Sequence, residues 1–247
     1  MDLLDRTKLE DYLDKELPDV IIHAAAKGAK KGEVESWDGI YIPNIRMFEN
    51  LFRSNKSRAK LIVIGSGAEF DRRYSIQYRR EDSIGYEWPI DPYGLSKNII
   101  AKRTIDLQDA YVLRLFGCFN FDEDPTRFIK ASILNLKAGR PIEIHKDREM
   151  DFFYLNDVFA VMHWVIMADH APQNINLVYL KKHTLKQIAN IICKYYYGWE
   201  SNFDGQIKMN SSEWDEPYTG SGMVLENLPI KLNGLERGID NTIRKLQ

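Results

Sequence analysis

Short runs of consecutive apolar residues alternate along the chain with stretches in which apolar residues recur at helical spacing. The consecutive runs predict buried strands at 20–23, 61–64 and 111–113. Helical spacing predicts a helix up to about residue 16, with Asp5 or Thr7 as its N-cap, and another at about 37–53. The first half of the chain is therefore expected to alternate strands with helices.

After Gly117 the pattern becomes a mixture of helices and short strands. Helices are expected at about 126–138, 156–168, 184–195 and 235–245, and Thr184 is the predicted N-cap of the third. Strands are expected at 142–144, directly after a Gly-Arg-Pro turn, and at 174–179. This half of the chain is predicted to be an α+β region.

The segment 70–90 is long, charged and rich in aromatic residues, and it is predicted to be a loop. A loop of this length in a compact domain is usually functional or mobile. Its arginines are candidates for contacts with an anionic substrate, and a solvated surface loop explains each of them at least as well: Arg72, Arg73, Arg79 and Arg80.

The composition narrows the class of protein. With 247 residues and 44% apolar content, the chain can bury a full core and form one large or two small domains. A net charge of −2 without a polybasic stripe argues against a nucleic-acid partner. The two cysteines, Cys118 and Cys193, do not have the spacing of metal ligands, and they indicate a reducing compartment. Without a signal peptide or an apolar run near 18 residues, a cytoplasmic protein with no membrane partner is expected.

Two features of the first half indicate proton-transfer chemistry. Ser66 follows the strand 61–64 and Gly65, and Tyr93 precedes Lys97 by four residues. Residues four apart on a helix share one face, so the Lys97 ammonium can lie near the Tyr93 phenol. A nearby positive charge lowers the pKa of a phenol from its usual value of about 10, so Tyr93 can exchange a proton near neutral pH. Taken alone, this spacing also arises by chance on amphipathic helices.

The wider context of this spacing resembles a known family. The order strand-Ser, loop, Pro-Tyr-x-x-x-Lys helix, strand resembles the extended short-chain dehydrogenase/reductase family, the NAD-dependent sugar epimerases and dehydratases. The resemblance implies an α/β, doubly wound parallel-sheet (Rossmann-like) domain that lacks its first strands, at 1–122. It also implies a smaller α+β substrate domain, mainly 123–247, with some chain returning to the first. NAD or NADP as cofactor, a nucleotide sugar as substrate and a homodimer are expected from the family.

The resemblance is incomplete at the N-terminus. In the family, a strand ending in Asp-Leu, here Asp2-Leu3, and the segment equivalent to 18–25 belong to the second half of the dinucleotide fold. The first half carries a Gly-rich turn for the cofactor pyrophosphate, and neither G-x-G-x-x-G nor G-x-x-G-x-x-G occurs in the sequence. The chain is expected to be a fragment of a longer product, or to receive the missing half from another chain. The residue that distinguishes NAD from NADP would lie in that half.

The resemblance also assigns roles to individual residues. The catalytic residues would be Ser66, Tyr93 and Lys97. Cofactor contacts are expected from Asp2, Leu3, Ala24, Ala25, Ala26, Asn44, Tyr93, Lys97 and Phe116. Substrate contacts are expected from Ser66, Gly67, Ala68, Gly117, Arg127 and Arg148, and no metal is expected. Asn44 would face inward and help to place the catalytic lysine, although a solvated position on its helix fits the sequence equally well.

Departures from the family pattern disfavour some of its reactions. The 4,6-dehydratases carry Asp and Glu after the catalytic hydroxyl, where this chain has Gly67 and Ala68. The 3,5-epimerising GDP-fucose synthases use a Cys and a His, which align here with Ala68 and Arg127. These replacements cannot perform general acid-base chemistry. Elimination and C3/C5 epimerisation are therefore disfavoured, unless a one-residue shift in alignment brings Glu69 into play.

The chemistry that remains is reduction of a 4-keto sugar, or 4-epimerisation, on a nucleotide-linked substrate. The family arginine that contacts the diphosphate aligns with Met150, and Arg148, Lys130 or Arg127 are candidates to replace it. Two other interpretations stay open at this point. In one, the chain is a non-catalytic binding protein built on the same fold, and in the other it is an inactive truncated fragment.

Overall fold

The computed structural model describes residues 1–28, 36–198 and 203–247, which form two compact units. The first unit comprises Met1–Tyr74, Arg80–Leu115 and Val165–Asn176, and the second Ser75–Arg79, Phe116–Trp164 and Leu177–Gln247. Each unit thus combines separate segments, and the sequence led us to expect a main boundary after residue 122 with some later chain returning to the first region. The functions expected of the two regions stay predictions. Among the described residues, no helix is both long and apolar enough to cross a membrane.

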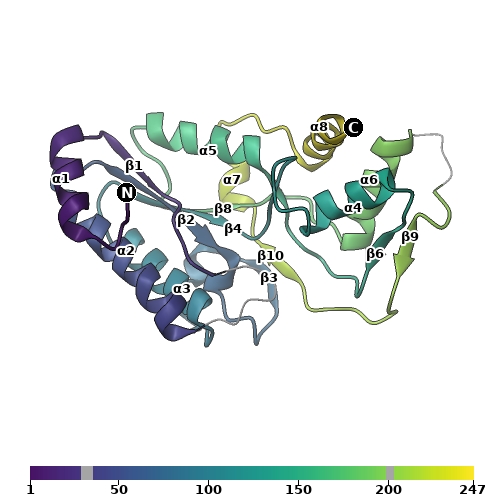
Figure 1. Cartoon of the computed structure of the whole chain (residues 1–247), viewed down its shortest axis with the longest axis horizontal. Coiled ribbons are helices and arrows are strands. Elements are labelled where there is room, and N and C mark those ends of the chain that lie inside the picture. Colours follow the sequence, from purple (N-terminus) through teal and green to yellow (C-terminus); the bar gives the residue numbers. More distant parts are fainter. Residues whose placement is uncertain (29–35, 199–202) are drawn as a thin grey trace. The chain divides into compact units, whose positions relative to one another are not determined.

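A four-stranded sheet forms the centre of the first unit, in the order β1-β2-β4-β8 (Figure 1). Its strands are β1 Val20–His23, β2 Lys60–Ser66, β4 Ala110–Leu115 and β8 Asn174–Leu177. Both β1 and β4 pair with β2 in parallel, so the carboxyl ends of these strands lie at the same edge of the sheet. The strands predicted at 20–23, 61–64 and 111–113 are confirmed, and the last two are longer than expected.

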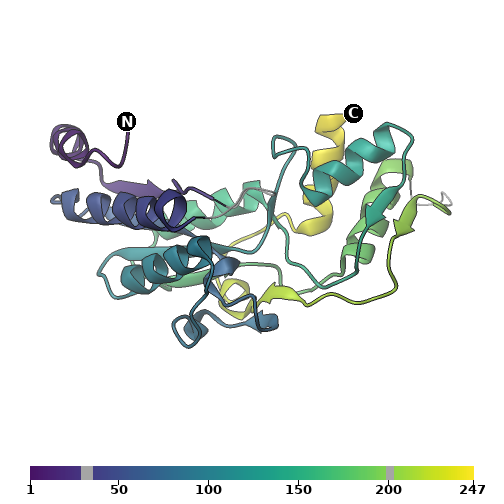
Figure 2. The ribbon, with the colours of Figure 1, turned by 60° about the horizontal axis from the view of Figure 1, so that its bottom comes forward.

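Three helices of the first unit pack on the sheet: α1 Arg6–Glu16, α2 Ile42–Ser54 and α3 Pro92–Ile105. Their apolar side chains join one face of β2 in a buried cluster of Leu9, Leu13, Phe48, Leu51, Leu61, Val63, Ile100 and Ala110. In both views α2 and α3 lie side by side (Figures 1 and 2). The N-cap of α1 is Asp5, which was predicted together with the alternative Thr7. The helix expected from residue 37 begins with a π-helical turn, Trp37–Tyr41, before α2.

The N-terminal residues form a turn and not the strand that the family pattern implies. Asp5 N donates to Asp2 O at 3.2 Å, and Leu4 N donates to Asp2 Oδ1 at 2.9 Å. Leu3 packs against the helix cluster, and its carbonyl accepts a hydrogen bond from Asn50 Nδ2 at 2.9 Å. These contacts hold Asp2 and Leu3 beside α1 and α2, outside the sheet.

The segment 70–90 is not the continuous loop that the sequence predicted. It contains β3, Ile76–Arg79, and a 3₁₀ turn, Glu81–Ser83. β3 pairs in parallel with β10, Tyr218–Gly220, in the second unit, and Tyr78 N donates to Thr219 Oγ1 at 2.9 Å. Three arginines of the segment form ion pairs with carboxylates: Arg72 with Asp91 at 2.9 Å, Arg73 with Asp71 at 2.5 Å and Arg80 with Asp82 at 2.7 Å.

The second unit is the α+β region that the sequence predicts. Its remaining elements are β5 Cys118–Phe119, α4 Phe128–Lys137, β6 Ile142–Ile144, β7 Phe153–Tyr154, α5 Leu155–Met167 (whose last turn belongs to the first unit), α6 Leu185–Tyr197, β9 Ile207–Met209, α7 Met223–Glu226 and α8 Leu235–Leu246. The helices α4, α6 and α8 gather around one core, which includes Ile133, Ile192 and Ile239, each fully buried (Figure 2). Thr184 caps α6 in a reciprocal box with Gln187, which confirms the predicted cap.

Candidate active site

Ser66 is the last residue of β2, at the carboxyl edge of the parallel sheet. Its hydroxyl accepts a hydrogen bond from Ala68 N at 3.2 Å and so caps a 3₁₀ turn, Gly67–Glu69. The Ser66 side chain is half-buried, whereas Gly67 and Ala68 are buried. A parallel strand followed by a capped turn therefore places a hydroxyl at the sheet edge.

The helix α3 carries Tyr93 and Lys97 one turn apart. Asp91 is its N-cap and accepts a hydrogen bond from Gly94 N at 2.7 Å, while Pro92 occupies the first helical position. Gly94 packs directly on the turn after Ser66, because a Cβ at this position would lie 2.6 Å from Ala68 O. Only glycine permits this approach between the start of the helix and the turn.

Two side chains of α3 reach back to β2 and the turn. Lys97 Nζ donates to Ile64 O at 2.8 Å, and Asn98 Nδ2 donates to Glu69 O at 2.7 Å. Lys97 is only 5% exposed, and burial lowers its pKa, while the nearby Glu69 carboxylate opposes this shift. Together with Gly94, these contacts fix the Tyr93 turn of α3 against the segment that follows Ser66.

Glu69 is fully buried and both of its carboxylate oxygens are engaged. Oε1 accepts from Ser66 N at 2.7 Å, and Oε2 accepts from Arg114 Nε at 2.6 Å. Arg114 is also fully buried, and it donates from Nη1 to Asn176 Oδ1 at 2.8 Å. With both oxygens bonded inside the unit, Glu69 has no access to a substrate carbon as a base. The alignment shift considered above therefore gains no support.

Asn44 faces inward at 2% exposure, so the solvated alternative is wrong. Its amide binds both backbone groups of Lys27, at 2.7 Å and 3.0 Å, and donates to Ser96 Oγ at 3.1 Å. Asn44 thus connects the segment after β1 to α3, beside Lys97 and not at its ammonium. In that segment Ala24, Ala25 and Ala26 follow the carboxyl end of β1 and are exposed.

The family of the chain follows from its sequence together with this arrangement. Residues 1–177 match the model of the NAD dependent epimerase/dehydratase family. The chain belongs to this family. The parallel sheet agrees with it and confirms the expected Rossmann-like α/β fold. A comparison with curated proteins finds no match.

Solved structures of other enzymes share the fold of this epimerase/dehydratase family member. UDP-glucose 4-epimerase from Thermotoga maritima, solved with UDP-glucose, is 17% identical over 100% of this chain and 82% of its own, with a TM-score of 0.76. The Bordetella bronchiseptica enzyme WbmG, in complex with NAD and UDP, is 18% identical over 99% and 76%, with a TM-score of 0.75. A GDP-6-OMe-4-keto-L-xylo-heptose reductase from C. jejuni is 13% identical over 100% and 87%, with a TM-score of 0.74.

The predicted contact residues of the second unit occupy varied settings. Phe116 is buried and packs edge-on against Tyr218, with ring centroids 5.3 Å apart. Gly117 allows close backbone packing, because a Cβ there would lie 2.7 Å from Asp151 O. Arg127 is exposed and directly precedes α4. The contacts of these residues with a ligand stay predictions.

Arg148 lies beside the residue that replaces the family's diphosphate-binding arginine. Its Nη2 is 3.6 Å from Met150 Sδ, and its Nη1 is 3.4 Å from Asp215 Oδ2. Lys130, another candidate replacement, instead donates from Nζ to Glu123 O at 2.6 Å. Among the three candidates, Arg148 is the one whose guanidinium contacts the Met150 side chain.

The sequence does not indicate two titratable side chains whose pKa values are shifted in the structure. His23, at the end of β1, is 3% exposed, and burial together with the charge of Lys97 lowers its pKa to about 4. Glu123 has a buried Oε1 without a hydrogen-bond partner among the described residues, and burial raises its pKa to about 7. No motif marks either residue, because both shifts depend on side chains and backbone that the fold brings together.

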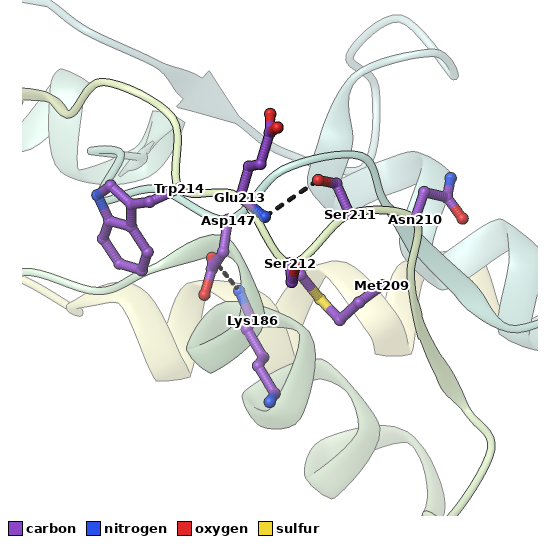
Figure 3. Close-up of a pocket in the computed structure, with 8 residues that line it drawn as sticks. All are labelled: Asp147, Lys186, Met209, Asn210, Ser211, Ser212, Glu213 and Trp214. Atoms are coloured by element: carbon purple, nitrogen blue, oxygen red, sulfur yellow. Dashed lines mark hydrogen bonds between the residues drawn. The ribbon is translucent and has the colours of Figure 1, made fainter.

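A surface hollow of about 520 Å³ lies in the second unit, beside the first turn of α6 (Figure 3). Asp147 Oδ1 accepts from the backbone N of Lys186 at 3.0 Å and closes one side of it, and the indole of Trp214 is 58% exposed. The hollow is lined by Asp147, Lys186, Met209, Asn210, Ser211, Ser212, Glu213 and Trp214. None of these residues was predicted to contact a ligand.

Proposed function

We propose that this protein carries out NAD(P)-dependent reduction or inversion at C4 of a nucleotide-linked sugar. The observation that carries the proposal is the attachment of the start of α3, which bears Tyr93 and Lys97, to the segment that carries Ser66. Gly94, Lys97 and Asn98 attach the start of α3 to β2 and the following turn. General acid-base catalysis needs such fixed geometry, because a proton donor must lie within hydrogen-bond reach of the reacting oxygen.

Each of the three side chains has a defined task in this proposal. The Tyr93 phenol gives a proton to the C4 oxygen during reduction, and its phenolate takes the proton back during oxidation. Ser66 Oγ hydrogen-bonds the same oxygen. The Lys97 ammonium, one turn from Tyr93 on the same helix, stabilises the phenolate by its charge.

The nicotinamide dinucleotide supplies or accepts the hydride when bound. An ammonium has three N–H donors. Within the described chain the Lys97 ammonium makes one hydrogen bond, to Ile64 O, and it is nearly removed from water. Its other donors suit ribose hydroxyls, and the exposed residues Ala24–Ala26 at the end of β1 suit a ligand at the same sheet edge. These residues therefore fit the cofactor, with Lys97 at a ribose.

The assignment of the reaction to C4 of the sugar rests on the residues that follow Ser66. Gly67 and Ala68 carry no acid or base, and the Glu69 carboxylate is bonded to Ser66 N and Arg114. Removal of a carbon-bound proton at C3, C5 or C6 needs a base that this segment does not provide. The solved structures named above include a 4-epimerase and a 4-keto sugar reductase, which supports a nucleotide-linked substrate.

The test is turnover in deuterated water. The protein is incubated with NAD or NADP and with nucleotide-linked 4-keto and 4-hydroxy sugars, and products are identified by mass spectrometry and NMR. We expect a change at C4 without deuterium at C3, C5 or C6. Tyr93→Phe should lower kcat by about 10²–10⁴-fold, whereas Tyr86→Phe, at an 84% exposed side chain, should leave it unchanged.

Three outcomes would contradict the proposal in different ways. Deuterium at C3 or C5 would reveal a further base and reopen the epimerase and dehydratase reactions. Parental turnover by a folded Tyr93→Phe variant would remove Tyr93 from the chemistry. Saturable binding of a nucleotide sugar without turnover under any condition would favour the binding-protein alternative.

A further inference from the structure

We propose that the buried Glu69–Arg114 ion pair is a positioning device that fixes the Ser66 backbone, and with it the Ser66 hydroxyl, at the edge of the sheet. The importance of the hydroxyl rests on the proposed function, whereas the position of the Ser66 backbone does not. Glu69 and Arg114 act through Ser66 and Lys97 and do not touch substrate themselves.

The contact to Ser66 is direct and reciprocal. Glu69 Oε1 accepts from Ser66 N at 2.7 Å, while Ser66 Oγ accepts from Ala68 N at 3.2 Å. Together they form a capping box around a turn of only three residues. The hydrogen bond to a charged carboxylate is stronger than one to a neutral acceptor, so the Ser66 backbone is held firmly.

Arg114 holds the carboxylate in turn. It lies on β4 opposite Gly65 of β2, and its Nε donates to Glu69 Oε2 at 2.6 Å. Nη1 is bound by Asn176 at 2.8 Å, and the guanidinium lies 5.1 Å from the centre of the Phe70 ring. The carboxylate is therefore oriented from a neighbouring strand, independently of the turn that it stabilises.

Gly65 provides the space for this arrangement. A Cβ at residue 65 would lie 2.5 Å from Glu69 Oε1 and 2.8 Å from Val112 Cγ1. The carboxylate thus occupies the place of the missing side chain on β2. Gly65 and Glu69 are matched in shape, which a chance surface ion pair would not require.

Stability alone does not account for the pair. Both side chains are fully buried, and the cost of removing two charges from water offsets much of their attraction. Apolar pairs of similar volume are often as stable or more stable at such positions. The carboxylate also raises the pKa of Lys97 against the effect of burial, so one group serves both Ser66 and Lys97.

The experiment compares three variants with the parent protein. Glu69→Gln removes the charge, and the double variant Glu69→Met/Arg114→Met replaces the pair by apolar side chains that preserve volume. Glu81→Gln is the matched control, because Glu81 is 8% exposed and accepts from Asn176 N at 3.1 Å without contacting Ser66. Each variant is examined by amide hydrogen exchange at Ser66, by thermal unfolding and by kcat and KM across pH.

We expect faster exchange of the Ser66 amide in both variants that lack the carboxylate, and parental exchange in Glu81→Gln. We also expect kcat to fall by about 10²-fold, the effect of a small misplacement, with KM nearly unchanged. The loss of kcat at high pH should begin at lower pH, because Lys97 gives up its proton more readily. In a Ser66→Ala background, Glu69→Gln should cost little further kcat at pH values where Lys97 keeps its proton.

Several results would overturn the inference. Parental Ser66 exchange in the folded Glu69→Gln variant would refute it, as would parental kcat and an unchanged pH profile in the folded double variant. Failure of both variants to fold while Glu81→Gln folds would make the pair a folding element only. If no variant or parent turns over a sugar but Ser66 exchange responds as expected, the positioning inference holds and the proposed function fails.

Discussion

A buried imidazole is the most pH-sensitive group at the carboxyl end of β1. His23 is 3% exposed, its Nδ1 has no hydrogen-bond partner among the described residues, and its pKa is lowered to about 4. Burial is the main cause, and the positive charge of Lys97 adds to it. His23 is therefore neutral at pH 7, and protonation favours the unfolded chain.

We predict that His23 makes the first unit sensitive to acid. Its folded pKa lies below the unfolded value of about 6.5, so its contribution to stability is complete above pH 6.5 and is lost as pH falls towards 4. The loss is expected to reach about 3 kcal/mol. Urea unfolding of the parent and His23→Gln between pH 4 and 8 measures it. Curves that stay parallel over this range would refute the assignment.

Ser66, Tyr93 and Lys97 could be predicted from the sequence as site residues, because a strand end and a four-residue helical spacing are both short-range patterns. The Glu69–Arg114 ion pair could not be predicted in this way, because Glu69 lies on a turn and Arg114 on a neighbouring strand. The engagement of Glu69 by Arg114 becomes visible only when β2 and β4 are paired with Gly65 opposite Arg114. For the same reason the sequence left the orientation of Asn44 undecided.

At the scale of elements, the two best-defined helix caps perform different tasks. Asp91 caps α3 one residue before the helix and two before Tyr93, and also lies 2.9 Å from Arg72. Thr184 caps α6 in the second unit through Gln187. Both caps satisfy backbone N–H groups, but only Asp91 belongs to the turn that carries Tyr93.

We predict that the two caps separate stability from activity. Asp91→Ala and Thr184→Ala should each destabilise the protein by about 1 kcal/mol. Only Asp91→Ala should also lower kcat, because fraying of the first turn of α3 moves Tyr93. Chemical unfolding and turnover of both variants provide the comparison. An equal effect on kcat, or none in either variant, would show that the α3 cap does not control Tyr93.

Helices and strands with local sequence signals could be predicted, whereas a strand that depends on a partner distant in the sequence could not. Strands and helices with their own apolar pattern or cap, such as β1 and α6, are found where the sequence indicates them. β3 was missed because its partner, β10, is distant in sequence, and the segment around it is charged. Asp2-Leu3 ends a strand in the family but lies in a turn here, because Leu3 packs on helices and Asn50 binds its carbonyl.

At the scale of the molecule, each compact unit holds a group with a shifted pKa, and the two shifts have opposite effects on stability. In the first unit, His23 is expected to reduce stability in acid. In the second unit Glu123 has its pKa raised to about 7, mainly by burial. A carboxyl with a raised folded pKa stabilises the folded state at low pH, and this contribution is lost as pH rises from about 4.5 through 7.

We predict that Glu123→Gln stabilises the second unit above pH 7 and has little effect below pH 4.5. The gain should be about 1 kcal/mol, since the side chain is partly exposed and solvent screens it. In calorimetry, the transitions of the two units in the parent should move apart as pH falls from 7 to 4.5. His23→Gln should reduce this movement for the first unit, and Glu123→Gln should reduce it for the second. A single transition that shifts as a whole in each variant would mean that the units unfold as one.

The matched shapes at positions 65 and 69 constrain how this sequence can change over evolutionary time. Alanine at 65 collides with the Glu69 carboxylate and with Val112, and loss of Glu69 alone leaves the Arg114 charge buried without its partner. We therefore expect single substitutions at these three sites to lower fitness and combined changes to restore it. Related sequences should vary at 65, 69 and 114 together or not at all. Deep mutational scanning of these three positions should find viable combinations whose single-substitution intermediates have low fitness.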